Sequence, residues 1–294
     1  MANQFNTVAL TGRIRKEATR QTFLNLIQHL QSRSVDLLIE EEIARELGIQ
    51  HLTTVAKPEL GLKSDLVIVV GGDGSLLETA RVVVDSQTPI IGVNRGRFGF
   101  LADIHPDYVA TVVDEILAGH YQQDNRFMLE ATLEGSDNVT HALNDIVLSS
   151  GNTAHMTEFE VYVNEDFMCS EHSDGLIIST PTGSTAYALS GGGPIIHPLL
   201  DAILLVPMFA HTLNSRPIVL RADMEISVKI GTRLSAKPVI SCDGNAFATV
   251  DAGQILKVRR KEIGLKLLHP KNYNYFEILG RKLSWGRRLV DLKF

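Results

Sequence analysis

Cysteines, aromatic residues and long apolar runs are scarce in this sequence of 294 residues, of which aromatic residues make up 6%. The two cysteines, Cys169 and Cys242, are too few for a scaffold built on disulfides, and we expect them to be reduced thiols in a core. The longest apolar stretch, Ala202 to Ala210, is about half a membrane span and contains Pro207. The segment from Met1 to Lys16 lacks the basic-then-apolar pattern of a secretion signal. We therefore expect a soluble, cytoplasmic protein with no membrane partner.

A basic excess is also absent. The 28 Lys and Arg residues against 34 Asp and Glu residues give a formal net charge of −6. Non-specific nucleic-acid binding depends on neutralising phosphates, so we expect no nucleic-acid partner. Phosphorylated small molecules remain possible ligands, because a local basic pocket can form on an acidic protein. The sequence also lacks internal repeats, and its 44% hydrophobic content allows one large or two medium-sized cores.

Strands and helices alternate in the first part of the chain. Residues 65–70 are apolar on both faces, as in a central parallel strand that helices cover on both sides. We expect further strands at 7–10, 35–39 and 89–93, and helices at 16–32, 40–47, 75–85 and 106–117. This alternation predicts a doubly wound α/β domain with a mostly parallel sheet over residues 1–122.

The pattern changes near Gln123, where short strands separated by turn residues begin. Residues 158–163 alternate polar and apolar side chains, as a half-buried antiparallel strand does. We expect the other strands at 127–133, 142–148, 175–179, 218–220, 225–230, 239–241 and 255–258. These elements predict a β-rich domain over 123–270, followed by a tail, 271–294, whose packing partner stays open.

A glycine turn with a central acid, Gly71-Gly72-Asp73-Gly74-Ser75, joins the buried strand to the next helix. Glycines at this place let a backbone approach a phosphate, and the N-terminus of a helix favours anions. The turn has neither P-loop nor dinucleotide-fingerprint spacing. Asp73 is suited to taking a proton from a sugar hydroxyl that attacks a phosphate. The alternative is that Asp73 only caps the helix.

Three further segments carry polar groups. An apolar strand runs from Asp174 into the hydroxyl-rich segment 179–187, and Tyr187 offers a flat face to a base or a ribose. Asn144 and Asp145 fall inside the expected strand 142–148, where polar groups need partners: either a ligand ribose or neighbouring strands. Arg95 and Arg97 lie between glycines after the strand 89–93, and they either bind phosphate or are solvated.

Together these segments resemble the NAD kinase family. The resemblance covers roughly residues 65 to 245 in the same order, and the most specific part runs from Asp174 through Thr-Pro-Thr-Gly-Ser-Thr-Ala-Tyr to Gly-Gly-Pro at 192–194. It implies an α/β domain, a C-terminal β-sandwich and an active site in the cleft between them. It also implies NAD as acceptor, ATP with Mg²⁺ as donor, and a homodimer or homotetramer.

The resemblance also implies site residues. Asp73 would be the general base, and no metal ligand from the protein is assigned. From the chemistry of phosphoryl transfer, Gly71, Gly72, Arg95 and Arg97 would bind phosphate. The NAD pocket, formed partly by a neighbouring subunit, would contain Gly74, Asn144, Asp145, His155, His172, Asp174, Thr185, Ala186, Tyr187, Ala188, Leu189, Ser190 and Asn245. His172 replaces an Arg of some bacterial relatives, and the residue equivalent to Asn245 varies among them.

Two other functions stay open at this point. Lipid kinases of the diacylglycerol and sphingosine type share the glycine turn, but the sequence shows neither a basic amphipathic helix nor their pattern after Asp174. A non-catalytic NAD(P) sensor would keep the pocket without requiring Asp73.

Overall fold

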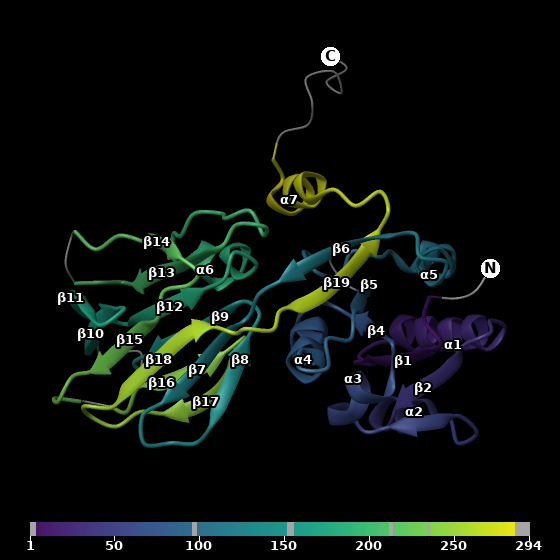
Figure 1. The fold of residues 1–294 in the computed structure, drawn as a ribbon, viewed down its shortest axis with the longest axis horizontal. Helices are drawn as coiled ribbons and strands as arrows, with labels where there is room; N and C mark the ends of the chain where they lie inside the picture. The colour runs from purple at the N-terminus through teal and green to yellow at the C-terminus, as the bar shows by residue number, and fades with distance from the viewer. Residues whose placement is uncertain (1–3, 96–98, 152–155, 212–213, 235, 286–294) are drawn as a thin grey trace, which may run out of the picture. The chain divides into compact units, whose positions relative to one another are not determined.

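The computed structural model describes residues 4–95, 99–151, 156–211, 214–234 and 236–285, and the chain folds into two compact units (Figure 1). The α/β unit contains Met1–Asn125 and Leu265–Phe294, and the β unit contains Arg126–Gly264. The sequence places residues 265–270 in the β-rich domain. In the structure they form a strand of the α/β unit's sheet, so the chain returns to its first unit.

The α/β unit is built on a seven-stranded sheet with the order β3-β2-β1-β4-β5-β19-β6. The pairings from β3 through to β19 are all parallel. The strands are β1 (Thr7–Gly12), β2 (Asp36–Glu40), β3 (Thr53–Val55), β4 (Leu66–Gly71), β5 (Ile90–Asn94), β6 (Tyr121–Arg126) and β19 (Leu265–Pro270). Because the central strands are parallel, the carboxyl ends of β1, β4 and β5 meet at one edge of the sheet.

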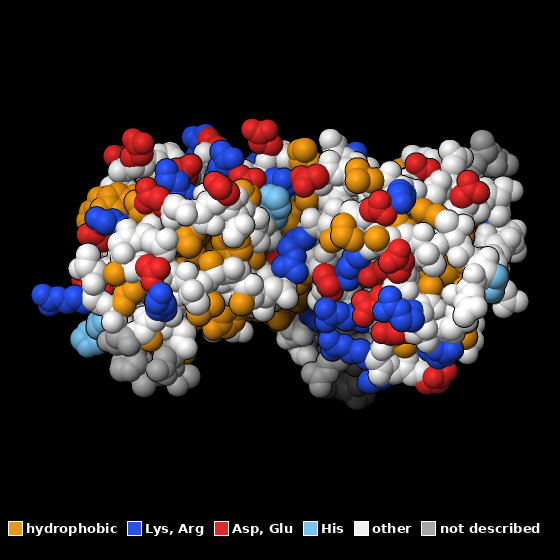
Figure 2. Space-filling view, turned by 90° about the horizontal axis from the view of Figure 1, so that it is seen from below, with side chains coloured by type: hydrophobic (Ala, Val, Ile, Leu, Met, Phe, Trp, Pro, Cys, Tyr) orange, Lys and Arg blue, Asp and Glu red, His pale blue; other side chains and the backbone are white. Residues whose placement is uncertain are grey.

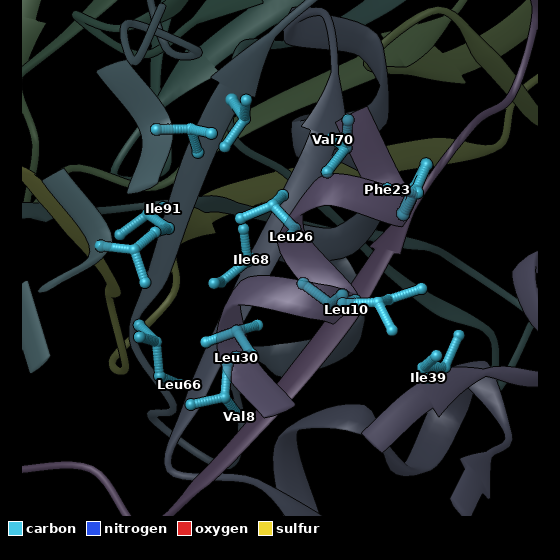
Figure 3. Packing of buried hydrophobic residues seen from close by; sticks show 14 of the residues in the cluster. Val8, Leu10, Phe23, Leu26, Leu30, Ile39, Leu66, Ile68, Val70 and Ile91 are labelled. Atoms are coloured by element: carbon cyan, nitrogen blue, oxygen red, sulfur yellow. The ribbon is translucent and has the colours of Figure 1, made fainter. Parts of the chain in front are cut away.

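Helices cover both faces of this sheet, which explains why β4 is buried along its whole length. Figure 3 shows one face, where Leu26 and Leu30 of α1 pack on Val8 and Leu10 of β1 and on neighbouring strands. On the other face α4 contacts β1, β4 and β5. The helices are α1 (Glu17–Gln31), α2 (Glu41–Leu47), α3 (Leu60–Lys63), α4 (Asp73–Val83), α5 (Val109–Leu117) and α7 (Tyr275–Leu283), with short 3-10 turns at Lys57–Glu59 and Pro106–Tyr108.

The β unit consists of two six-stranded antiparallel sheets. One has the order β11-β10-β15-β18-β7-β8, with β7 (Leu129–Leu133), β8 (Val139–Ala142), β10 (Thr157–Val163), β11 (Asp166–Ser173), β15 (Ile226–Ile230) and β18 (Ile255–Arg260). The other has the order β14-β13-β12-β9-β16-β17, with β9 (Asp145–Ser149), β12 (Gly175–Ser179), β13 (Ala202–Met208), β14 (Ile218–Arg221), β16 (Val239–Cys242) and β17 (Asn245–Thr249).

Alternate residues of both sheets form the core of the β unit, with Phe159 of β10 fully buried among them. The second sheet is also buried on its outer face, where Ile177 and Val206 pack against Ala188 of α6 (Tyr187–Ser190). Strands β12 and β13 are therefore apolar on both faces, which explains why their sequences are nearly continuous apolar runs. Cys242 is buried in this unit, Cys169 is half-buried, and no disulfide joins them.

The structure corrects two expected elements. The strand expected at 142–148 is two strands, β8 and β9, separated by a bend at Leu143 and Asn144, so Asn144 is not inside a strand. The helix expected from Ser75 begins two residues earlier, at Asp73. In addition, the apolar stretch at 202–210 contributes the strand β13, and the tail contains α7. Among the described helices, none has the length and apolar character needed to span a membrane.

Candidate functional site

The glycine turn lies at the carboxyl edge of the α/β sheet. Gly71 is the last residue of β4, Gly72 is the extended N-cap residue of α4, and Asp73 is its first helical residue. The Asp73 side chain does not cap this helix, so the capping alternative is wrong. A Cβ at Gly72 or Gly74 would meet no heavy atom within 4 Å, and both residues are exposed. The backbone of the turn is therefore open at the N-terminus of an eleven-residue helix.

The Asp73 carboxylate is held by three successive backbone amides of another segment. Phe100 donates its N–H to Oδ2 at 2.9 Å, and Leu101 and Ala102 donate theirs to Oδ1 at 3.1 Å each. Gly99 packs against the same carboxylate, because a Cβ at Gly99 would lie 2.1 Å from Oδ1. The segment Gly99–Ala102, here called the amide loop, thus fixes the orientation of Asp73.

The amide loop is in turn fastened to β5. Asn94 Nδ2 donates to the carbonyl oxygen of Ala102 at 3.2 Å, and Val93 forms a parallel bridge with Ile104. Arg95 donates its backbone N–H to the carbonyl of Gly71 at 3.0 Å, while its guanidinium hydrogen-bonds the hydroxyl of Thr22 on α1. Arg95 is therefore beside the glycine turn but is directed toward α1. Arg97 lies outside the described residues.

Two basic residues that the sequence did not single out also follow strands of this sheet. Arg13 comes after β1 and Lys57 after β3, and both form ion pairs with Glu78 of α4, at 2.9 Å and 2.8 Å. Burial alone would raise the pKa of Glu78, but Lys57 and Arg13 outweigh it and the pKa is lowered. Figure 2 shows Lys and Arg side chains beside Asp and Glu on this unit. Their position after strand ends was the pattern that could have identified them.

In the β unit, three strand ends of the second sheet bring polar groups together. Asp145 begins β9 opposite Ser179, the last residue of β12, and Ile146 pairs with Cys242, the last residue of β16. The carbonyl of Asn144 accepts the N–H of Thr180 at 2.9 Å and the Ser179 hydroxyl at 3.2 Å. The pair Asn144–Asp145 is thus fixed by its backbone at one edge of the sheet.

Asp243 fixes the same pair from the other side, and the sequence had assigned it no role. Its carboxylate accepts the N–H groups of Leu143, Asn144 and Asp145 at 3.0, 2.8 and 3.3 Å. Asp243 has a φ of 48° and Gly244 a φ of 74°, as in a two-residue hairpin turn between β16 and β17. The Asp-Gly sequence was a recognisable hairpin pattern.

The Asp145 side chain is 5% exposed. Burial and the neighbouring Asp243 charge raise the pKa of Asp145 to about 7. Near neutral pH this carboxyl group therefore passes between a hydrogen-bond donor and a charged acceptor.

The hydroxyl-rich segment divides into a buried and an accessible part. The hydroxyl of Thr180 donates to the Leu143 carbonyl at 2.6 Å, and that of Ser184 donates to the Pro181 carbonyl at 2.6 Å, so both are structural. Ala188 is buried in the core under α6. The half-buried or exposed members are Thr185, Ala186, Tyr187, Leu189 and Ser190, and Tyr187 is 48% exposed. Asn245 is also exposed and donates its side-chain amide to the Asp243 carbonyl at 3.1 Å.

Asp174 and His172 lie at the opposite end of β12. The N–H of Asp174 donates to the Met208 carbonyl, and Gly175 pairs with Ser149 at the far end of β9. With a rise of about 3.3 Å per residue, this end is about 13 Å from Ser179. His172 is exposed, and His155 lies outside the described residues. The expected NAD residues of the β unit therefore form two separate groups within one chain.

Comparison with known proteins gives matches to both units. Residues 8–121 match the model of the ATP-NAD kinase N-terminal domain, and residues 143–269 match that of the ATP-NAD kinase C-terminal domain. An NAD kinase of Chromohalobacter salexigens is 48% identical over 290 residues, which are 98% of this chain and 99% of that protein. One of Pseudomonas putida is 44% identical over 289 residues, 97% of this chain and 98% of that protein.

Two solved structures share the fold. Yeast NADH kinase complexed with NADH aligns with a TM-score of 0.88 and 28% identity, covering 98% of this chain and 90% of the yeast chain. An NAD kinase from Archaeoglobus fulgidus in complex with ATP aligns with a TM-score of 0.76 and 21% identity, covering 95% of this chain and all of the other.

Proposed function

The chain belongs to the ATP-NAD kinase family and phosphorylates NAD to NADP with ATP, and we propose that Asp73 is its catalytic carboxylate. In this proposal the γ-phosphate of ATP moves to the 2′-hydroxyl of the adenosine ribose of NAD. The observation that supports the role of Asp73 is its fixed orientation: three amides hold a half-buried carboxylate at the open N-terminus of α4.

The hydrogen-bond pattern leaves Asp73 one position for a substrate. A carboxylate offers about two acceptor positions on each oxygen. Oδ1 uses two for Leu101 and Ala102, whereas Oδ2 uses one for Phe100. The ribose hydroxyl would donate to the remaining position of Oδ2. As its oxygen bonds to the γ-phosphorus and the bond to the β–γ bridging oxygen breaks, the proton passes to Asp73.

The phosphates would be bound by the glycine turn. The open backbone of Gly72 and Gly74 and the N-terminus of α4 offer N–H groups to the negative charge that develops in the transition state. Arg95 would add a guanidinium after releasing Thr22, and the same role for Arg97 remains a prediction. Mg²⁺ would arrive on the ATP phosphates and offset their charge. It commonly takes phosphate oxygens and water there, so the proposal assigns it no protein ligand.

The NAD pocket would use the first group of the β unit. Asn144 and Asp145 would bind ribose hydroxyl and amide groups, and Tyr187 would lie against a ring, with Thr185, Ala186, Leu189, Ser190 and Asn245 of the same unit as further members of the pocket. Ala188 would contribute through its backbone, because its side chain is buried. In its ionised form Asp145 would only accept hydrogen bonds from ribose hydroxyls, whereas in its protonated form it would also donate one.

The second group, Asp174 and His172, would bind the NAD molecule that lies in the pocket of a neighbouring subunit. The separation of the two groups by the length of β12 supports a homodimer or homotetramer. We also propose that the protein acts in the cytoplasm, where Cys169 and Cys242 would stay reduced.

The test is NADP formation from NAD, ATP and Mg²⁺, followed with an NADP-specific dehydrogenase. Asp73→Asn should keep the fold and lower kcat by about 10²-fold or more, since a positioned general base contributes that much. Asp137→Asn, in an exposed turn of the β unit, is the matched control. Near wild-type turnover in Asp73→Asn would remove Asp73 from the mechanism.

The Asp73→Asn variant also tests whether two subunits share one NAD pocket. Asp73→Asn and Asp174→Asn, each inactive alone, should regain part of the activity when subunits are mixed and exchanged, because one mixed site has both carboxylates. Absence of any regained activity after verified subunit exchange would contradict the shared pocket.

A further inference from the structure

A second cluster of charged side chains adjoins the amide loop, and the function proposed above does not use it. His269 on β19 has a fully buried side chain. Its Nδ1 donates to Asp103 Oδ2 at 2.9 Å, and its Nε2 lies 3.5 Å from Asp124 Oδ2 on β6. The Tyr273 ring stacks on the imidazole with a centroid distance of 3.8 Å and an angle of 15°. The cluster therefore joins three neighbouring segments of the sheet.

The charges of this cluster depend on one another. Burial alone would lower the pKa of His269, but the hydrogen bonds and charges of Asp103 and Asp124 outweigh it and raise the pKa. The Asp103 side chain is 5% exposed, and its buried Oδ1 has no hydrogen-bond partner in the described part of the chain. The protonated imidazole thus compensates the negative charge of the Asp103 carboxylate. Without the imidazolium, a buried carboxylate would be left with an uncompensated charge.

Asp103 connects the cluster to Asp73 because it directly follows the amide loop. The N–H groups that hold the Asp73 carboxylate come from Phe100, Leu101 and Ala102. On its β5 side the loop is fastened through Asn94, and on its β19 side through Asp103 and His269. A second contact from the C-terminal segment reaches the same loop, where Lys282 Nζ of α7 lies 5.4 Å from the centre of the Phe100 ring.

We propose that Asp103 and His269 are positioning residues for phosphoryl transfer. The ion pair holds the end of the amide loop against β19, and the loop then keeps the three amides directed at the Asp73 carboxylate. His269 and Asp103 act through this loop and touch no substrate. The inference rests on the proposed role of Asp73 in the reaction.

Two variants of His269 separate positioning from simple stability. The amide nitrogen of Asn in His269→Asn falls near the place of Nδ1, so this variant keeps a donor for Asp103. The amide nitrogen of Gln in His269→Gln falls near Nε2, so this variant keeps a donor for Asp124 only. Both variants lose the charge and the aromatic stack on Tyr273. They should therefore lose similar amounts of stability but differ in their hold on the amide loop.

The activity measurement is kcat and KM for NAD and ATP, well below the Tm of each variant. His269→Gln should lose kcat by about tenfold or more with KM values near wild type, since a misplacement of about 1 Å costs up to 10²-fold in rate. His269→Asn should retain most of kcat despite a similar Tm. The control is His120→Gln, an exposed histidine after α5. Wild-type kcat in His269→Gln, or equal losses of kcat in both variants, would overturn the proposal.

Amide hydrogen exchange gives a readout that does not depend on catalysis. The N–H groups of Phe100, Leu101 and Ala102 should exchange faster in His269→Gln than in His269→Asn, while those of β1 keep their protection. If Asp73→Asn proves active, the catalytic proposal fails, but this exchange still decides whether His269 holds the loop. If both His269 variants fail to fold, Asp103→Asn replaces them, because it keeps the shape and removes the charge. Unchanged exchange and unchanged kcat in Asp103→Asn would overturn the proposal.

Discussion

Replacing Gly99 with alanine tests whether the amide loop positions Asp73. A Cβ at Gly99 would lie 2.1 Å from Asp73 Oδ1, 3.0 Å from Asp73 Cγ and 3.1 Å from the Ala102 carbonyl oxygen. Ordinary contact begins at 3.4 Å, so the carboxylate or the loop must move by about 1 Å. The requirement for glycine here is one of space, because a Cβ would overlap the Asp73 carboxylate.

Such a movement has two consequences of different size. Hydrogen bonds to a charged group contribute about 1.5–3 kcal/mol each, so losing one of the three amide contacts should lower the free energy of unfolding by about that amount. The rate should suffer more, because a misplacement of about 1 Å at a reacting group costs up to 10²-fold. We therefore expect Gly99→Ala to lower kcat by about 10²-fold with a modest fall in Tm.

The assay is NADP formation at saturating NAD, ATP and Mg²⁺, with Tm and circular dichroism measured on the same preparations. Gly280→Ala in α7 is the matched control, since a Cβ there would meet nothing within 4 Å. It should keep wild-type kcat and gain a little helix stability. If Gly99→Ala folds and turns over within a few-fold of wild type, the amide loop does not set the position of Asp73.

Two further predictions concern the β unit. The pKa of Asp145 is raised to about 7 from 3.8, so the folded state prefers the protonated form, and the stability from this group is present below about pH 4 and is lost as pH rises from there to 7. Between pH 5 and pH 8 wild type should lose about 2.6 kcal/mol more than Asp145→Asn in urea unfolding, and equal losses would contradict this. Asp243→Asn tolerates the positive φ but removes the charge and at least one acceptor for residues 143–145. NAD affinity should fall about tenfold, with KM for ATP unchanged and the pH at which Asp145 titrates shifted downward; an unshifted titration would refute the coupling.

The fold of the α/β unit was predictable because it depends on the spacing of apolar residues that are close together in the chain. Strands β1, β2, β4 and β5 and the helices between them follow apolar spacing that neighbouring residues set. The glycine turn was recognisable for the same reason, since residues 71–75 lie together in sequence at a strand end. The strand β3 has only three residues, too few for periodicity to show, and the hairpin partners β11 and β17 lack a clear alternation of apolar and polar residues.

The bend at Asn144 could not be predicted from the local sequence. The run from Ala142 to Leu148 is consistent with one strand, and the break between β8 and β9 exists because Asp243, about a hundred residues later, binds the amides of 143–145. Likewise, the hydroxyls of Thr180 and Ser184 looked available to a ligand but are used inside the fold.

By itself the sequence determined the family, the order of the α/β elements and the identity of the acid in the glycine turn, since each depends on residues close together in the chain. The tertiary structure decided what holds those residues in place. Phe100–Ala102 orient Asp73, Asp243 orients Asn144 and Asp145, and a strand near the C-terminus brings His269 to Asp103. These contacts join residues 27 to 166 positions apart. No local propensity encodes such pairs, because they form only when the sheets have assembled.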